Sequence, residues 1–328
     1  MDFITLKNKK IKGRAVLAPM AGISFSSYRK FFKKFHVAFS YTEMVSDMGL
    51  IYGNKETLSY LKIDKGEPLV GLQLFGNSSE TLLKGMDIAL KTNPNFAFVD
   101  VNMACPVNKV TSAGSGSSLL KDVDKIGDII STLKRNTSLP VSIKIRLGID
   151  DGHLNYLDVI NKAISSGVDF IALHARTKKQ LYSGKPLYEE IRGLKKHVSV
   201  PLIISGDIFT LEDAINAINI VNADYVLIAR GGIGNPLLVK EINHYFKIGK
   251  IKHYKRTINK QIKYCLRLAK LIIKDKGEYC GMKIFRGIAP RFFNGLANSK
   301  YVKCALSSKL NTYKDLCLIL KEYKKRNK

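Results

Sequence analysis

The sequence of 328 residues lacks any apolar run that approaches the ~20 residues needed to cross a bilayer. It also lacks a signal segment at its start, because residues 1–12 alternate apolar with charged side chains. A Gly-rich dinucleotide fingerprint is missing from its early part, which argues against an open Rossmann sheet. These absences predict a soluble, cytoplasmic protein without membrane association.

Cysteine is scarce and irregularly placed. The five cysteines are odd in number, widely spaced and without a C-x-x-C pair, at positions 105, 265, 280, 304 and 317. Such a pattern suggests neither a disulfide framework nor a structural zinc site, and we expect no metal. Each thiol is expected by default to be buried and inert. Cys105 is the exception, because it lies in the short segment after a predicted strand.

Acidic residues are few beside the basic ones, at 27 against 54, which leaves a net charge of +27. The excess is uneven: residues 241–328 hold 23 Lys and Arg with five acidic residues, whereas residues 1–240 hold 31 with 22. Clustering in one segment favours a polyanionic partner over a general use of Lys on solvated surfaces. A nucleic acid is therefore expected as a partner, and no protein partner is implied.

Short apolar or β-branched runs alternate with helix-length amphipathic stretches over the first 240 residues. Eight of these runs are predicted strands, at residues 15–18, 37–41, 69–74, 97–101, 141–145, 170–173, 202–204 and 225–228. Eight strands separated by helices predict a parallel sheet closed into a barrel. The expected fold is α/β, a (β/α)8 TIM barrel at residues 1–240 followed by a small, basic α-helical domain at residues 241–328.

Helical patterns support both parts of this division. Thr210 and Asp213 form a candidate capping box for the helix after the seventh strand. Apolar residues spaced among Lys and Arg at 266–273 and 316–320 predict a small helical bundle near the C-terminus.

Polar residues follow nearly every predicted strand. In a barrel of this type the chemistry lies at the C-terminal ends of the strands, so the segments there are the candidates for a site. They are residues 19–22, 43–44, 73–76, 102–106, 144–146, 174–177, 205–207 and 229–232.

The motifs at these strand ends resemble the tRNA-dihydrouridine synthases, most closely their bacterial B-type branch. The resemblance extends from about Ile11 to the C-terminus and rests on six motifs in order: LAPMAG at 17–22, QLFG at 73–76, NMACP at 102–106, KIRLG at 144–148, HART at 174–177 and RGGIGNP at 230–236. It implies an enzyme that uses FMN, with NADPH or NADH as electron donor, to reduce the C5=C6 bond of uridines in the D-loop region of tRNA.

The resemblance implies a set of FMN-binding residues: Pro19, Met20, Ala21, Gln73, Lys144, His174, Ser205, Gly206, Asp207, Ala229, Arg230 and Gly231. Simple chemistry agrees for several of them. The loop at 229–232 offers backbone N–H groups and the Arg230 cation to a phosphate, although a plain turn is the alternative for its Gly-Gly pair. The Gln73 amide can pair with a pyrimidine ring, and the Lys144 cation suits the negative charge of reduced flavin. Ser205 departs from the family, which commonly has Asn there.

Uracil reduction needs a hydride at C6 and a proton at C5. A thiol keeps its proton at neutral pH yet releases it readily, so Cys105 is the predicted general acid. The resemblance places Asn102 at the uracil edge and Arg176 near the flavin or the substrate. Ala104 stands where relatives usually have Gly.

Two other functions stay open. A dihydroorotate or dihydropyrimidine dehydrogenase also combines FMN, a barrel and a thiol, but it has no need of the strongly basic C-terminal segment. A barrel that has lost catalysis could act purely as an RNA-binding factor. Retention on tRNA and flavin colour would discriminate among the three.

Overall fold

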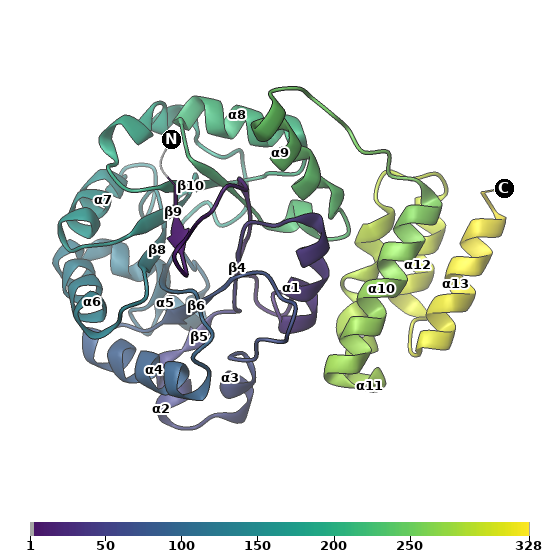
Figure 1. Cartoon of the computed structure of the whole chain (residues 1–328), viewed down its shortest axis with the longest axis horizontal. Helices are drawn as coiled ribbons and strands as arrows, with labels where there is room; N and C mark the ends of the chain where they lie inside the picture. Colours follow the sequence, from purple (N-terminus) through teal and green to yellow (C-terminus); the bar gives the residue numbers. More distant parts are fainter. Residues whose placement is uncertain (1–2, 328) are drawn as a thin grey trace.

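Eight parallel strands form a closed barrel at the positions that the sequence predicts (Figure 1). The computed structural model describes residues 3–327. Strand β4 pairs with both β3 and β6, which closes the ring, and the short strand β5 (Val45–Ser46) adds a pairing to the end of β6. The barrel strands are β3 (Ala15–Leu17), β4 (Ser40–Tyr41), β6 (Val70–Phe75), β7 (Phe98–Met103), β8 (Val141–Arg146), β9 (Phe170–His174), β10 (Leu202–Ser205) and β11 (Tyr225–Ile228).

Helices surround the barrel and bury their apolar faces against it (Figure 1). The capping box at the start of α8 is confirmed, since the Thr210 side chain accepts from the Asp213 backbone and the Asp213 side chain accepts in return. The helices of this part are α1 (Ser26–Phe32), α2 (Asp47–Ile51), α3 (Lys55–Ser59), α4 (Ser79–Thr92), α5 (Asn108–Thr111), α6 (Val123–Asn136), α7 (Tyr156–Ser165), α8 (Leu211–Val221) and α9 (Leu237–Ile248).

Aromatic rings fill the N-terminal half of the barrel interior. The ring of Phe98 lies 5.3 Å from that of Phe39 and 5.1 Å from that of Phe170. Gly71 leaves room for Phe98, because a Cβ at residue 71 would come within 2.1 Å of the ring. This end of the barrel is therefore packed solid, and space for a ligand remains only toward the other end.

An N-terminal hairpin covers the packed end. It consists of β1 (Thr5–Leu6) and β2 (Lys9–Lys10), which pair antiparallel. The Tyr225 hydroxyl accepts a hydrogen bond from the Ile4 amide and donates to the Ile11 carbonyl, at 3.0 and 2.7 Å. The hydroxyl of this barrel residue thus fixes the hairpin to the N-terminal end of the barrel.

Four helices follow the barrel, and the first of them packs against α1, which confirms the expected helical C-terminal region (Figure 1). Phe31 of α1 and Phe35, in the 3-10 turn that follows α1, pack against Tyr264, with ring centroids 6.4 and 5.2 Å away. Lys62 and Asp275 add an ion pair of 2.5 Å across the same contact. The helices are α10 (Ile258–Lys276), α11 (Glu278–Arg286), α12 (Ser299–Ser308) and α13 (Tyr313–Lys325).

The expected division between residues 240 and 241 falls inside helix α9. This helix packs against α8 and β3, so it belongs with the barrel, and residues 249–257 lead from it to α10. Within residues 3–327, no helix has the length and apolar character needed to span a membrane.

Candidate active site

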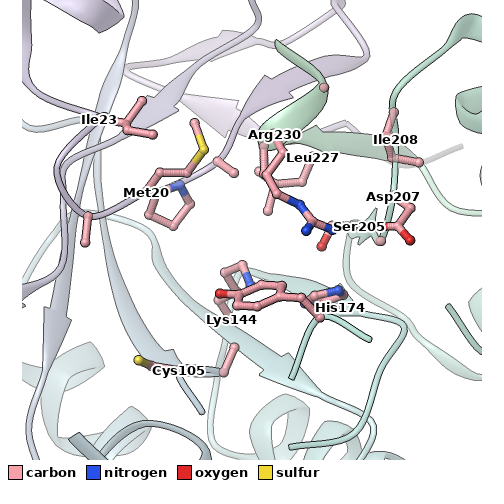
Figure 2. A pocket seen from close by; sticks show the side chains of 18 of the residues that line it. Met20, Ile23, Cys105, Lys144, His174, Ser205, Asp207, Ile208, Leu227 and Arg230 are labelled. Atoms are coloured by element: carbon pink, nitrogen blue, oxygen red, sulfur yellow. Dashed lines mark hydrogen bonds and ion pairs between the residues drawn. The ribbon is translucent and has the colours of Figure 1, made fainter. Parts of the chain in front are cut away.

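A cavity of about 370 Å³ lies at the C-terminal ends of the barrel strands (Figure 2). Loops after β3, β7, β10 and β11, together with the ends of β8 and β9, bring its lining residues together from distant parts of the chain. Thirteen of the predicted site residues line it: Pro19, Met20, Ala21, Asn102, Cys105, Lys144, His174, Ser205, Gly206, Asp207, Ala229, Arg230 and Gly231.

Gln73 and Arg176 are the two predicted site residues that do not line the cavity. Both are fully buried behind its wall. The Gln73 amide is hydrogen-bonded at both ends, to Asp100 and Asn102. The Arg176 guanidinium donates to Asp207 and to two loop carbonyls, at Ser183 and Gly184. In this arrangement both side chains support other lining residues.

The wall of the cavity carries an excess of positive charge. Lys144, Arg146, Arg230 and Arg291 line it, against the single carboxylate of Asp207. Burial, together with the nearby Arg146 cation, lowers the pKa of Lys144 to about 8. Among the described residues, no cluster of three or more His, Cys, Asp or Glu could hold a metal ion. The charge therefore suits an anionic ligand.

His174 is held neutral. Burial lowers its pKa well below the ordinary value of 6.5, and the cations of Lys144 and Arg146 lower it further. Its Nε2 lies 3.5 Å from Nη1 of Arg176. A neutral imidazole offers one donor and one acceptor, so His174 can orient a polar ligand without adding charge.

One corner of the cavity combines a cation with closely packed backbone. Nη2 of Arg230 donates to the Asp207 carboxylate at 2.6 Å, and its guanidinium lies 5.2 Å from the ring centroid of Tyr182 and 5.5 Å from that of Phe209. Gly231 packs so tightly that a Cβ there would lie 1.9 Å from the Ile208 carbonyl oxygen. Arg230 is thus fixed in direction yet keeps donors free for an anion.

Cys105 lies across the pocket from this corner (Figure 2). The side-chain Oδ1 of Asn102 accepts from the backbone amides of Ala104 and Cys105, at 3.1 and 2.9 Å. The Cys105 carbonyl accepts from the amide and hydroxyl of Ser117, at 3.0 and 2.9 Å. Gly116 permits this contact, since a Cβ there would come within 2.8 Å of the same carbonyl. Hydrogen bonds therefore fix the backbone that carries the thiol at the cavity wall.

The other cysteines lie outside the cavity. Cys265 is buried among the C-terminal helices, as expected of an inert thiol. The expectation of burial is wrong for Cys280, Cys304 and Cys317, which are exposed. These three lie on α11, α12 and α13, at positions that face solvent.

Three further lining residues had no assigned role in the sequence. Arg146 lies in a segment already named, and its guanidinium donates to the Ala104 carbonyl at 2.8 Å. Tyr182 comes from a loop without a motif, and Arg291 comes from the C-terminal helical region, far along the chain. A strand-end pattern could indicate Arg146, but no sequence signal connects the other two with the barrel.

Comparison with known proteins gives a consistent result. The family model described as "Dihydrouridine synthase (Dus)" matches residues 16–325. A "Probable tRNA-dihydrouridine synthase" of Rickettsia conorii is 31% identical over 307 residues, which are 93% of this chain and 91% of that protein. The "tRNA-dihydrouridine synthase B" of Pseudomonas syringae pv. tomato is 33% identical over 236 residues, 72% of this chain and 69% of that protein. Among solved structures, an old yellow enzyme homologue from Zymomonas mobilis covers 79% of this chain, and this chain covers 95% of it, at 13% identity and a TM-score of 0.48.

Proposed function

Because this chain belongs to the dihydrouridine synthase family, we propose that it reduces uridines in the D-loop region of tRNA, with bound FMN and with NADPH or NADH as the electron donor. The observation that carries the proposal is the cavity itself, which places the Cys105 thiol and a cation-rich wall on one site at the C-terminal face of a barrel.

The charges of the lining residues suit FMN. Four cations against one carboxylate suit a ligand that carries a phosphate and whose ring becomes negatively charged on reduction. Arg230 and the backbone of Gly206 and Gly231 would hold the phosphate, and Lys144 and His174 would face the ring. When bound, the flavin supplies the hydride that it receives from NADPH or NADH. We therefore infer FMN as the cofactor.

Cys105 supplies the second half of the reduction. Adding hydride to C6 of uracil leaves negative charge toward C5, and the Cys105 thiol gives its proton to that carbon, leaving a thiolate. The contacts of Asn102 and Arg146 hold the peptide group between Ala104 and Cys105, directly before this thiol. Arg176 does not line the cavity and so acts on a bound ligand through Asp207 and His174, which it contacts. The predicted contact of Asn102 with the uracil stays a prediction.

A basic groove on the C-terminal helices offers a place for the rest of the RNA. A base stacked inside tRNA cannot reach the cavity, so it has to be extruded while phosphates elsewhere hold the molecule. Tyr313 lies in the groove, with the Lys270 ammonium 5.8 Å from its ring. The basic residues of the groove are Lys263, Arg267, Lys270 and Lys274 on α10 and Lys324 on α13. Their spacing along α10 forms one continuous cationic stripe.

Two measurements test the proposal. The purified protein should be yellow and release FMN, not FAD, on denaturation. With NADPH or NADH it should form dihydrouridine in unmodified tRNA while leaving free uracil and orotate unreduced. A protein that stays colourless after incubation with FMN would contradict the enzyme assignment, and reduction of the free pyrimidines alone would favour a dihydropyrimidine or dihydroorotate dehydrogenase.

A further inference from the structure

A chain of hydrogen bonds runs through the barrel from β8 to the loop of Cys105. The Ser142 hydroxyl donates to Oδ1 of Asp100 at 2.6 Å, and Nε2 of Gln73 donates to Oδ2 of Asp100 at 2.7 Å. Nδ2 of Asn102 donates to Oε1 of Gln73 at 2.9 Å. The side-chain Oδ1 of Asn102 then accepts hydrogen bonds from the backbone amides of Ala104 and Cys105. The side chains of this hydrogen-bond relay are all buried, namely those of Ser142, Asp100, Gln73 and Asn102.

The relay has only one consistent direction. Backbone amides can only donate, so the Asn102 oxygen has to face the loop and its NH2 group has to face Gln73. The Gln73 oxygen then faces Asn102, and the Gln73 NH2 group requires an acceptor on its far side. Asp100 is that acceptor. If the Gln73 side-chain amide were flipped, its NH2 group would face the NH2 group of Asn102. If the Asn102 amide were flipped as well, its NH2 group would face the two backbone N–H groups of the loop.

The acceptor role of Asp100 does not depend on its charge. Burial raises the pKa of Asp100 to about 7, although the hydrogen bonds from Ser142 and Gln73 lower it. A protonated Asp100 can donate from Oδ1 to the Ser142 hydroxyl. The Ser142 hydroxyl then donates to the Val99 carbonyl oxygen, which lies 3.5 Å away. Oδ2 still accepts from Gln73 in that state, so the direction of the relay is preserved.

We propose that Asp100 is a positioning residue that fixes the Cys105 loop through Gln73 and Asn102. It touches neither the cavity nor the thiol, and it acts across the shared interior of β6 and β7. The relevance of this positioning to catalysis rests on the proposed function, because only then does the thiol deliver a proton. The positioning itself is a property of the protein that can be measured without turnover.

The test is the rate at which iodoacetamide alkylates individual cysteines in the full-length protein. Samples are compared at equal flavin content, and peptide mass spectrometry follows Cys105 and Cys265 separately. Asp100→Ala should raise the Cys105 rate at least ~10-fold while leaving that of Cys265, buried in another part of the molecule, unchanged. Asp100→Asn should keep the wild-type rate, because its amide oxygen can accept from Gln73 and its NH2 group can donate to Ser142.

A matched control distinguishes positioning from general loosening. Tyr225→Phe removes two buried hydrogen bonds at the opposite end of the same barrel and should leave the Cys105 rate unchanged. If Asp100→Ala does not fold, Gln73→Met breaks the relay one step nearer the loop and should raise the Cys105 rate instead. An unchanged Cys105 rate, or a parallel rise of Cys105 and Cys265, would overturn the proposal. A wild-type protein that fails to reduce tRNA would count against the proposed function alone.

Discussion

The guanidinium of Arg176 and the carboxylate of Asp207 form a bidentate ion pair behind the wall of the cavity. Asp207 in turn accepts from Arg230, which lines the cavity. Burial alone would raise the pKa of Asp207, but the hydrogen bond and charge of Arg176, with a contribution from Arg230, lower it below its ordinary value. The buried Arg176 therefore holds the Asp207 carboxylate, and this carboxylate aligns Arg230, which is accessible from the cavity.

The first prediction concerns the stability of this pair. Asp207→Asn leaves the buried Arg176 without its anionic partner and should lower the free energy of unfolding by about 1.5–3 kcal/mol at pH 7. Because the folded-state pKa of Asp207 is lowered, its contribution is present above the ordinary carboxyl pKa of about 4 and is lost as the pH falls through the folded value. Urea unfolding at pH 7 and at pH 3 should therefore show a difference that shrinks in acid.

A surface pair provides the control for that measurement. Glu189→Gln removes the carboxylate that Arg192 binds at 2.5 Å, but both side chains are largely exposed. Its effect should stay within about 0.5 kcal/mol, as for other exposed pairs. If the two variants lose equal free energy of unfolding, the burial of Arg176 does not strengthen its pair with Asp207.

The second prediction concerns the proton donor. Cys105→Ala should retain bound flavin and its reduction by NADPH or NADH, because the change removes only a thiol at the cavity wall. Reduction of tRNA should fall at least ~100-fold, the usual scale of general acid catalysis. Single-turnover assays would separate the two half-reactions. Cys317→Ala, at an exposed thiol far from the cavity, should have no effect, and an equal loss there would contradict the assignment.

The third prediction follows from the lowered pKa of Lys144. Its charge is lost as the pH rises through about 8, so the affinity for FMN, which is anionic, should weaken with rising pH over this range. The dissociation constant should rise by up to ~10-fold per pH unit, the limit for one proton. A titration that follows flavin fluorescence from pH 7 to pH 10 would measure it.

Two variants define the contribution of Lys144. Lys144→Met removes the cation at every pH, so its affinity should be low and insensitive to pH in this range. Lys144→Arg retains a cation that does not lose its proton there, so the same pH dependence should disappear without the loss of charge. A pH dependence that survives in both variants would assign the titration to a different group.

The fourth prediction concerns the basic groove. Changing Arg267 and Lys270 to Glu should weaken tRNA binding and flatten its dependence on salt, since fewer phosphates are neutralised and fewer counterions released. Flavin content should stay unchanged because the groove is separate from the cavity. The matched control changes Lys300 and Lys309, exposed residues of the same helical region outside the groove, by the same charge. Equal losses would indicate a general charge effect rather than a binding groove.

The sequence by itself determined the barrel and half of the residues that line the cavity. Parallel strands are buried on both faces, so each appears as a short apolar run, and all eight runs correspond to strands of the structure. Residues at the ends of such strands converge at one face of the barrel. Thirteen predicted residues consequently meet at one cavity, although they come from segments up to about 200 residues apart.

Only the tertiary structure decided what each side chain faces. Gln73 and Arg176 lie at strand ends like the lining residues, yet their neighbours, Asp100 and Asp207, hold them behind the wall. Arg291 reaches the cavity from a separate helical region, and helix α9 continues across the expected boundary because it packs on the barrel. A local pattern reports burial and periodicity, whereas hydrogen-bond partners and contacts between distant segments arise only when the chain closes on itself.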